Sequence, residues 1–286
     1  MSLPRSSYYY KGKEKKTTEA SLVQRIEELV EEFSRYGYRR ITAQLHREGI
    51  RVNHKKVLRI LRERELLCKP KHRWVRTTDS HHPYRIYPNL LPVSPATAPN
   101  QVWVADLTYI RILMGFVYLA VILDLFSRKA IGYGVSRNID TPLSLQALHM
   151  ALESRNPPSG VIHHSDRGVQ YAAHEYVDTL VSHGFQISMA RRGNPYDNAV
   201  VESFIKTLKT EEVYLWEYQS LEDVKKRIPY FIEQVYNQKR LHSALNYRPP
   251  NEFEDMFLTQ NPQNPCLTHS NLICPNTGVH SIWITT

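Results

Sequence analysis

Residues 101–135 read QVWVADLTYIRILMGFVYLAVILDLFSRKAIGYGV, and this stretch decides the fold. Its β-branched and aromatic residues fall into three runs, which predict strands at Gln101–Ile110, Gly115–Leu123 and Arg128–Val135. Because only short turn segments separate these runs, we expect three consecutive antiparallel strands.

The chain that follows alternates between helical and strand patterns. We expect the order βββαβαβα, which is a mixed α/β layer fold. The predicted elements after the third strand are a helix at Pro142–Ser154, a strand at Val161–His164, a helix at His174–His183, a strand at Phe185–Met189 and a long helix from near Pro195. Two more helical stretches are expected near Leu221–Asn237 and Pro250–Phe257.

Residues 20–67 have the periodicity of three helices. The first is predicted at Ala20–Tyr36 and the second at Tyr38–Glu48, and Asn53 is a suitable N-cap for the third. Short helices joined by a glycine-containing turn fit a helix-turn-helix. The basic residues of the third helix, which could meet DNA, are His54, Lys55, Lys56, Arg59, Arg62 and Arg64. A plain helical bundle with solvated charges is the alternative.

Five prolines lie within residues 83–99, too many for a helix or a central strand. This segment is therefore predicted to be a semi-rigid linker between domains. The expected organisation is a basic arm at 1–19, a helix-turn-helix domain at 20–82, the linker at 83–99, an α/β core with its C-terminal helices at 100–257, and a poorly ordered, uncharged tail at 258–286.

The charge of this 286-residue chain is unevenly distributed. Residues 1–82 contain 20 Lys and Arg against 10 Asp and Glu, whereas the rest contain 17 against 18. Positive charge concentrated in one domain indicates a nucleic-acid surface. No apolar run approaches a membrane span and the first residues lack a signal-peptide core, so we expect a soluble protein inside the cell. The three cysteines lie too far apart to suggest a zinc ribbon.

Three acidic residues lie where the predicted fold could use them. Asp106 is inside the first strand, where a lone carboxylate is costly to bury unless it is paired or bound to a metal. Asp166 follows the fourth strand, and ligands gather at strand ends in α/β folds. Glu202 falls on the polar side of the last long helix, away from its apolar stripe.

Three such carboxylates can form an all-oxygen site for Mg²⁺ or Mn²⁺. Two ions of this kind can activate an attacking oxygen and stabilise the leaving oxygen of a phosphodiester. Each residue taken singly has an ordinary alternative, which is a hydrogen-bonded aspartate in a strand or a solvated glutamate on a helix. Asp124 is the main competing carboxylate, and we expect it to cap a turn. His163 and His164, beside Asp166, are expected to be structural.

Several longer motifs point to a family. They are YGYRRI (36–41), VLRILRERELL (57–67), DLTYI (106–110), HSDRGVQY (164–171), RRGNPYDNAVVESFIKTLK (191–209) and YNQKRLHSALNYRPP (236–250). With 35 residues between Asp166 and Glu202, and Lys209 seven residues after Glu202, the chain from about residue 20 to 257 resembles the integrase-core transposases of the IS-three family.

The resemblance implies a ribonuclease-H-like core with a mixed five-stranded sheet, preceded by an all-α helix-turn-helix domain. In that core Asp106, Asp166 and Glu202 would be the DDE triad that holds two Mg²⁺ or Mn²⁺ ions. The implied reaction frees a 3′-OH at each insertion-sequence end and then uses it to attack another phosphodiester. No covalent protein–DNA intermediate is expected.

The implied partners are double-stranded DNA, as terminal inverted repeats and target, further copies of this chain, and an upstream helix-turn-helix product of the OrfA type, separate or fused. The expected location is the bacterial cytoplasm, with no membrane partner. Lys209 matches the family's lysine near the reacting phosphate. The other expected DNA contacts are Lys206, Asn198, Arg191, Arg192, Lys55, Lys56, Arg59, Arg62 and Arg240. Two other functions stay open: a DNA-binding remnant or repressor with an inactive core, and a nuclease that hydrolyses without joining.

Overall fold

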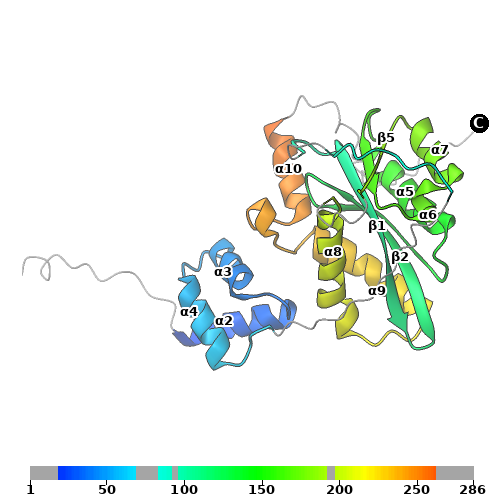
Figure 1. Cartoon of the computed structure of the whole chain (residues 1–286). Coiled ribbons are helices and arrows are strands. Elements are labelled where there is room, and N and C mark those ends of the chain that lie inside the picture. Colours follow the sequence, from blue (N-terminus) through cyan, green and yellow to red (C-terminus); the bar gives the residue numbers. More distant parts are fainter. Residues whose placement is uncertain (1–18, 69–82, 92–95, 192–196, 262–286) are drawn as a thin grey trace, which may run out of the picture.

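The computed structural model describes residues 19–68, 83–91, 96–191 and 197–261 (Figure 1). They form an N-terminal helical domain and a larger α/β domain. The predicted arm at 1–19, apart from Glu19, and the tail beyond residue 261 lie outside the described residues. Among the helices that are described, none is both long and apolar enough to cross a membrane.

The helical domain contains the three predicted helices, α2 (Glu19–Glu32), α3 (Tyr38–Arg47) and α4 (His54–Glu63). The first ends at Glu32 rather than at Tyr36, because the chain turns at residues 33–35. This turn places Tyr36 in the core of the domain, where it is 2% exposed. Asn53 caps α4 as expected, since its side chain accepts a hydrogen bond from the Lys55 amide at 2.8 Å.

The α/β domain is built on a five-stranded mixed sheet, as predicted. Its strands are β1 (Val102–Ile112), β2 (Gly115–Asp124), β3 (Ala130–Ser136), β4 (Ile162–Ser165) and β5 (Gln186–Met189). They lie in the order β3-β2-β1-β4-β5. The first three are antiparallel neighbours, whereas β4 pairs parallel with both β1 and β5.

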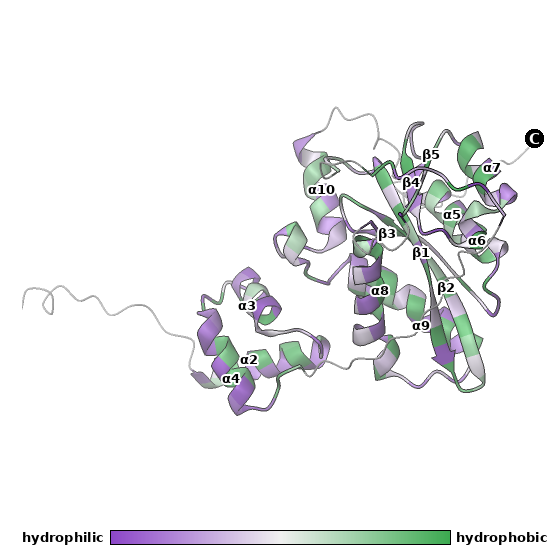
Figure 2. Cartoon of the chain, in the orientation of Figure 1, coloured by the Kyte–Doolittle hydropathy of each residue, from purple (hydrophilic) through white to green (hydrophobic). Residues whose placement is uncertain are grey.

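Helices cover both faces of this sheet (Figure 1). One face packs against α5 (Thr141–Arg155) and α7 (His174–Ser182), with the short α6 (Val169–Ala172) between them in sequence. The other face packs against α8 (Ala199–Glu211) and α9 (Leu221–Tyr230). Alternate β1 residues serve the two cores, with Val104 on the α8 side and Trp103 on the α5 side. Figure 2 shows hydrophobic residues both on the strands and on the helices that cover the sheet.

The helical region after α8 differs from the prediction in its subdivision. The stretch expected at Leu221–Asn237 is α9 followed by a π-helical segment, η2 (Phe231–Asn237). Pro229 lies at this junction and has no N–H for the helical ladder. The remaining elements are the 3₁₀ turns η1 (Val213–Leu215) and η3 (Ser243–Leu245), and α10 (Pro250–Gln260). Because α10 continues to Gln260, the first residues of the predicted tail are helical.

The proline-rich linker is docked on the α/β domain where it is described. The Leu90 amide donates to Ser188 Oγ at 2.8 Å, and Pro88 accepts from the Met189 amide at 3.4 Å. Tyr84 and Tyr87 also pack against the α5-side core. Proline excludes regular helix here, as expected, but these contacts with β5 make the segment part of the domain rather than a free spacer.

Candidate active site

The strand register brings Asp106 and Asp166 to the same level of the sheet. β4 runs parallel to β1, and His164 pairs with Val104. Asp166 directly follows the last β4 residue, Ser165, and its charge acts on Asp106, so the two carboxyl groups lie near each other. The last residue pair between β1 and β4 is Val104 with His164, so Asp106 lies where the two strands separate. This opening at a strand end is where an α/β sheet offers room for a ligand.

Asp106 is on the α8 side of the sheet, by the two-residue alternation of its strand. Its Oδ1 accepts the Leu107 amide at 2.8 Å. Burial, followed by the charge of Asp166, raises the pKa of Asp106 to about 8, and Glu202 adds to this effect. The nearby Lys209 ammonium opposes it. Asp166 and Glu202 are therefore each close enough to Asp106 for their charges to act on its carboxyl group.

Asp166 is held by the tight turn that follows β4. Its Oδ1 accepts the Gly168 amide at 2.9 Å. A Cβ on residue 168 would lie 3.0 Å from this oxygen, so glycine allows the backbone to approach the carboxylate. The turn then begins α6 and places Tyr171 in the interior, where it is 2% exposed.

Glu202 stands on the exposed side of α8, while Val201, Phe204 and Leu208 anchor the helix in the core. Partial burial raises the pKa of the Glu202 carboxyl. The helix begins at Ala199, later than the expected start near Pro195, and residues 192–196 lie outside the described residues. Asp197 precedes the helix and binds Arg191. In the described parts of the chain, no three His, Cys, Asp or Glu side chains already form a metal-binding cluster.

Lys209 and Asn198 both lie near these carboxylates. The Lys209 ammonium sits 4.2 Å from the centre of the Tyr109 ring, a cation–π contact. Burial lowers the pKa of Lys209, and the carboxylate of Asp106 counteracts this. Asn198, one turn before Glu202, is 7% exposed, and its Oδ1 has no partner in the described structure. Lys206 is exposed on the same helix.

Tyr171 follows Asp166 in the HSDRGVQY motif, where the sequence left open a contact with DNA or packing in the core. Its hydroxyl is buried and has no hydrogen-bond partner in the described part of the chain. Burial raises the pKa of this phenol, and Tyr176, Asp106 and Asp166 add to the effect. A buried polar atom without a partner, beside two carboxylates, indicates a site completed by water or a ligand. The side chain packs in the core, which is one of the two alternatives for this residue.

Asp124 caps a turn, as expected. It is fully buried, and its oxygens accept the amides of Asn100 at 2.6 Å, Phe126 at 2.9 Å and Ser127 at 3.1 Å. These hydrogen bonds connect the loops at the end of β2. This arrangement gives Asp124 a structural role rather than a place beside Asp106.

Asp124→Ala is expected to lower the free energy of unfolding by about 3 kcal/mol, because three buried amides lose their acceptor. Urea denaturation measures this effect. Asp178→Ala, at an exposed position on α7, is the control and should leave stability nearly unchanged. Wild-type stability in Asp124→Ala, together with lost DNA nicking, would restore Asp124 as a catalytic candidate.

His163 and His164 are structural in their contacts. His163 Nε2 pairs with the Tyr176 hydroxyl at 2.9 Å, and His164 Nδ1 pairs with Ser188 Oγ at 2.8 Å. Burial lowers the pKa of His163 to about 3 and that of His164 to about 4. Both rings are therefore neutral at physiological pH and help to hold β4 in place.

The predicted basic contacts fall into distinct environments. On α4, Lys55 and Arg62 are exposed, whereas Lys56 and Arg59 form ion pairs with Glu19. Such exposed pairs are weak and can exchange for phosphate. Arg191 is exposed and pairs with Asp197, and Arg192 lies outside the described residues.

Arg240 does not fit its expected role. It is 3% exposed, and it binds both oxygens of Glu211 at 2.7 Å. A guanidinium that is buried and paired in this way is unavailable to a phosphate. The sequence could not reveal this, because Glu211 is 29 residues away and its proximity depends on how α8 and η2 pack.

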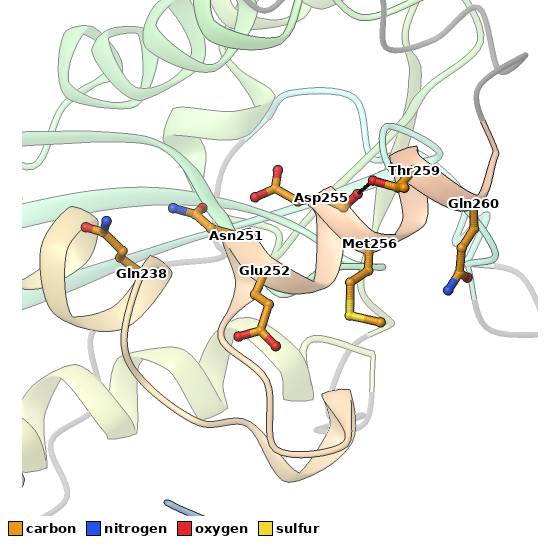
Figure 3. Close-up of a pocket in the computed structure, with 7 residues that line it drawn as sticks. All are labelled: Gln238, Asn251, Glu252, Asp255, Met256, Thr259 and Gln260. Carbon is orange, nitrogen blue, oxygen red and sulfur yellow. Dashed lines mark hydrogen bonds between the residues drawn. The ribbon is translucent and has the colours of Figure 1, made fainter. Parts of the chain in front are cut away.

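A hollow of the described surface lies elsewhere, along α10 (Figure 3). Gln238, Asn251, Glu252 and Asp255 are among the residues that line it. Glu252 is already paired with Arg47 of the helical domain at 2.5 Å. None of the predicted catalytic carboxylates lines this hollow, so it is separate from the candidate active site.

Family models match most of the described chain. A model described as an HTH-like domain matches residues 17–74, and two models described as integrase core domains match residues 96–195 and 183–250. The first covers the helical domain. The other two cover the sheet, α8 and the segment that contains Arg240.

Among curated relatives, the IS600 uncharacterized 31 kDa protein of Shigella sonnei is 41% identical, over 78% of this chain and 82% of the relative. The transposase for IS904 of Lactococcus lactis is 40% identical, over 77% and 87%. Transposase InsF for IS3A of Escherichia coli is 38% identical, over 78% of each. Among solved structures, the simian T-cell lymphotropic virus intasome with PP2A regulatory subunit B56 gamma aligns at a TM-score of 0.48 and 15% identity, over 91% of this chain and 80% of that one.

Proposed function

The chain belongs to the IS-three family of insertion-sequence transposases, and on that premise we propose that Asp106, Asp166 and Glu202 are its catalytic carboxylates. As an integrase-core transposase it is a DNA-binding polynucleotidyl transferase that acts in DNA transposition. The observation that supports the three residues is the pKa of Asp106, which burial and then the charges of Asp166 and Glu202 raise to about 8. Such crowding of acids is costly unless a ligand compensates for it.

The donor set fits a divalent cation of the Mg²⁺ or Mn²⁺ type. All three candidate side chains are carboxylates, and hard cations prefer oxygen ligands. The unpartnered Tyr171 hydroxyl and Asn198 Oδ1 are further oxygens beside the site. We propose two ions, held by Asp106, Asp166 and Glu202, which would supply positive charge to the attacking and leaving oxygens when bound.

The reaction consists of two displacements at phosphorus. In the first, a water oxygen attacks a phosphodiester at the element end, the P–O3′ bond breaks, and a free 3′-OH remains. In the second, this 3′-OH attacks a target phosphodiester and displaces another 3′ oxygen. Neither step needs a protein nucleophile, which agrees with a site made of carboxylates.

Lys209 is proposed to contact DNA close to the reacting phosphate. Its ammonium is held over the Tyr109 ring and next to Asp106, so it brings positive charge to the acidic site. Lys206 and Asn198 lie on the same helix, and Arg191 precedes it. Lys55, Lys56, Arg59 and Arg62 of α4 are proposed to bind the terminal repeats, with Arg192 as an additional contact. Arg240 is left out because it is buried.

The domain boundaries follow from the same proposal. Residues 20–82 would recognise the insertion-sequence ends, and residues 100–257 would carry the chemistry. Two DNA ends must meet for strand transfer, so we propose that several copies of this chain assemble on DNA, with the OrfA-type product as partner. The bacterial cytoplasm, where the DNA is, would be the place of action.

The decisive experiment incubates the purified chain and a labelled oligonucleotide carrying the element's end with Mn²⁺ or with EDTA. Metal-dependent joined products, longer than the input strand, are expected. If the chain alone is inactive, the assay is repeated with the upstream product fused to it. Nicks without joined products would favour the nuclease. No reaction from either the chain alone or the fusion would favour the inactive remnant.

A further inference from the structure

The motif YNQKRLHSALNYRPP (236–250), called here the docking segment, plays no part in the proposed chemistry. In the structure this segment contacts the helical domain. Leu241 is 1% exposed and belongs to the hydrophobic core of the helical domain, together with Ile41 and Leu45. The Leu241 amide donates to the Tyr36 hydroxyl at 2.8 Å, across the boundary between the two domains. Tyr247 packs against the same core.

Next to Leu241, Arg240 connects the docking segment to the catalytic helix. Its Nε and Nη2 donate to the two oxygens of Glu211, each at 2.7 Å. This bidentate geometry is the strongest form of such a pair. Arg40 of α3 approaches the same carboxylate, with Nη1 3.6 Å from Oε1. Glu211 is therefore shared by an arginine from each domain.

Two ion pairs flank this centre. Arg47 of α3 binds Glu252 of α10 at 2.5 Å, and Lys239 lies 3.4 Å from Glu32 of α2. Both are more exposed than the Arg240–Glu211 pair. The interface thus has a buried centre of Tyr36, Leu241 and Arg240 with a charged rim. Specific protein interfaces have this arrangement.

Glu211 is the last residue of α8, the helix that carries Glu202 and Lys209. We propose that the docking segment is the seat of the helical domain and that Glu211 and Arg240 are positioning residues, which fix that domain relative to α8. Because α8 is one rigid element, the exposed basic side chains of α4 are then held at a fixed position relative to Glu202. This consequence for DNA rests on the proposed function, whereas the docking itself does not.

The test measures the interdomain distance in the full chain, without DNA or metal. Cys68, Cys266 and Cys274 are replaced by Ser, and spin labels are attached at Glu31→Cys on α2 and Glu153→Cys on α5, both at exposed positions. Pulsed electron resonance should give one narrow distance distribution. It should become clearly broader in the double variant Tyr36→Phe/Arg40→Gln and in Leu241→Asp.

Arg25→Gln is the matched control. Arg25 pairs with Glu48 at 2.7 Å inside the helical domain, so its loss should leave the distribution narrow. Circular dichroism must show unchanged helix content in each variant, so that undocking is separated from unfolding. A broad distribution in the unmutated background, or a narrow one in both interface variants, would overturn the proposal whatever the outcome of the DNA assays.

The consequence for DNA is then read from nicking positions on the end-bearing oligonucleotide. In the double variant we expect nicks spread over several positions, with chemistry retained, whereas Arg25→Gln should cut where the wild type does. A uniform loss of rate at the wild-type position would contradict a positioning role. Failure of every protein to nick would count against the proposed function and leave the distance result standing.

Discussion

Glu202→Gln is expected to lower the rate of end nicking by about 10³-fold or more, since a lost metal ligand removes several kcal/mol of transition-state stabilisation. Glutamine keeps the length and shape of glutamate but lacks the negative charge. Glu202 lies on the exposed side of α8, and Val201 and Phe204 hold the helix in the core. The fold should therefore be preserved while the chemistry is lost.

Single-turnover nicking of a labelled element end, with saturating protein and Mn²⁺, measures this effect. Glu217→Gln is the matched control, because residue 217 is also exposed but lies outside α8. Thermal unfolding of both variants checks that the fold is intact. Equal nicking by Glu202→Gln and Glu217→Gln would remove Glu202 from the catalytic set.

The second large effect is expected on stability. Here the substitution should stabilise the folded protein. Asp106→Asn should raise the free energy of unfolding of the metal-free protein at pH 7 by about 2 kcal/mol, because the amide avoids the cost of a buried, repelled acid. The same change should abolish nicking and remove any stabilisation by Mn²⁺. A substitution that stabilises the fold and destroys activity is the signature of a functional site.

The pH dependence gives a further check on the same variant. The pKa of Asp106 rises from its ordinary 3.8 to about 8 in the folded chain. A folded state that binds the proton more tightly than the unfolded state loses stability as pH rises between these two values. The wild type should therefore fall in stability relative to Asp106→Asn from pH 5 to pH 8.

Urea denaturation in EDTA, at intervals over that pH range, measures the difference between the two proteins. Repeating it with Mn²⁺ should restore stability to the wild type alone, most strongly at high pH, since a carboxylate must be deprotonated to bind metal. A stability difference between the two proteins that does not change with pH would show that the pKa of Asp106 is not raised.

Much of the architecture could be predicted from local pattern. The three-strand meander, the alternation of helix and strand after it, and the three N-terminal helices all depend on periodicities within single elements. Where the predicted boundaries were wrong, a local turn or a neighbour was the cause. Tyr36 left the first helix because it packs inward, and Pro229 divided the helical stretch after Leu221.

The sequence by itself determined the fold class, the three carboxylates proposed for catalysis and the family, because these depend on residue type, spacing and motif. The tertiary structure decided which residues share a site. Only the register of β4 on β1 brings Asp166 to Asp106, and only the packing of α8 reassigns Arg240 from DNA to Glu211. Both are long-range contacts, whose geometry is set by the whole core rather than by nearby residues.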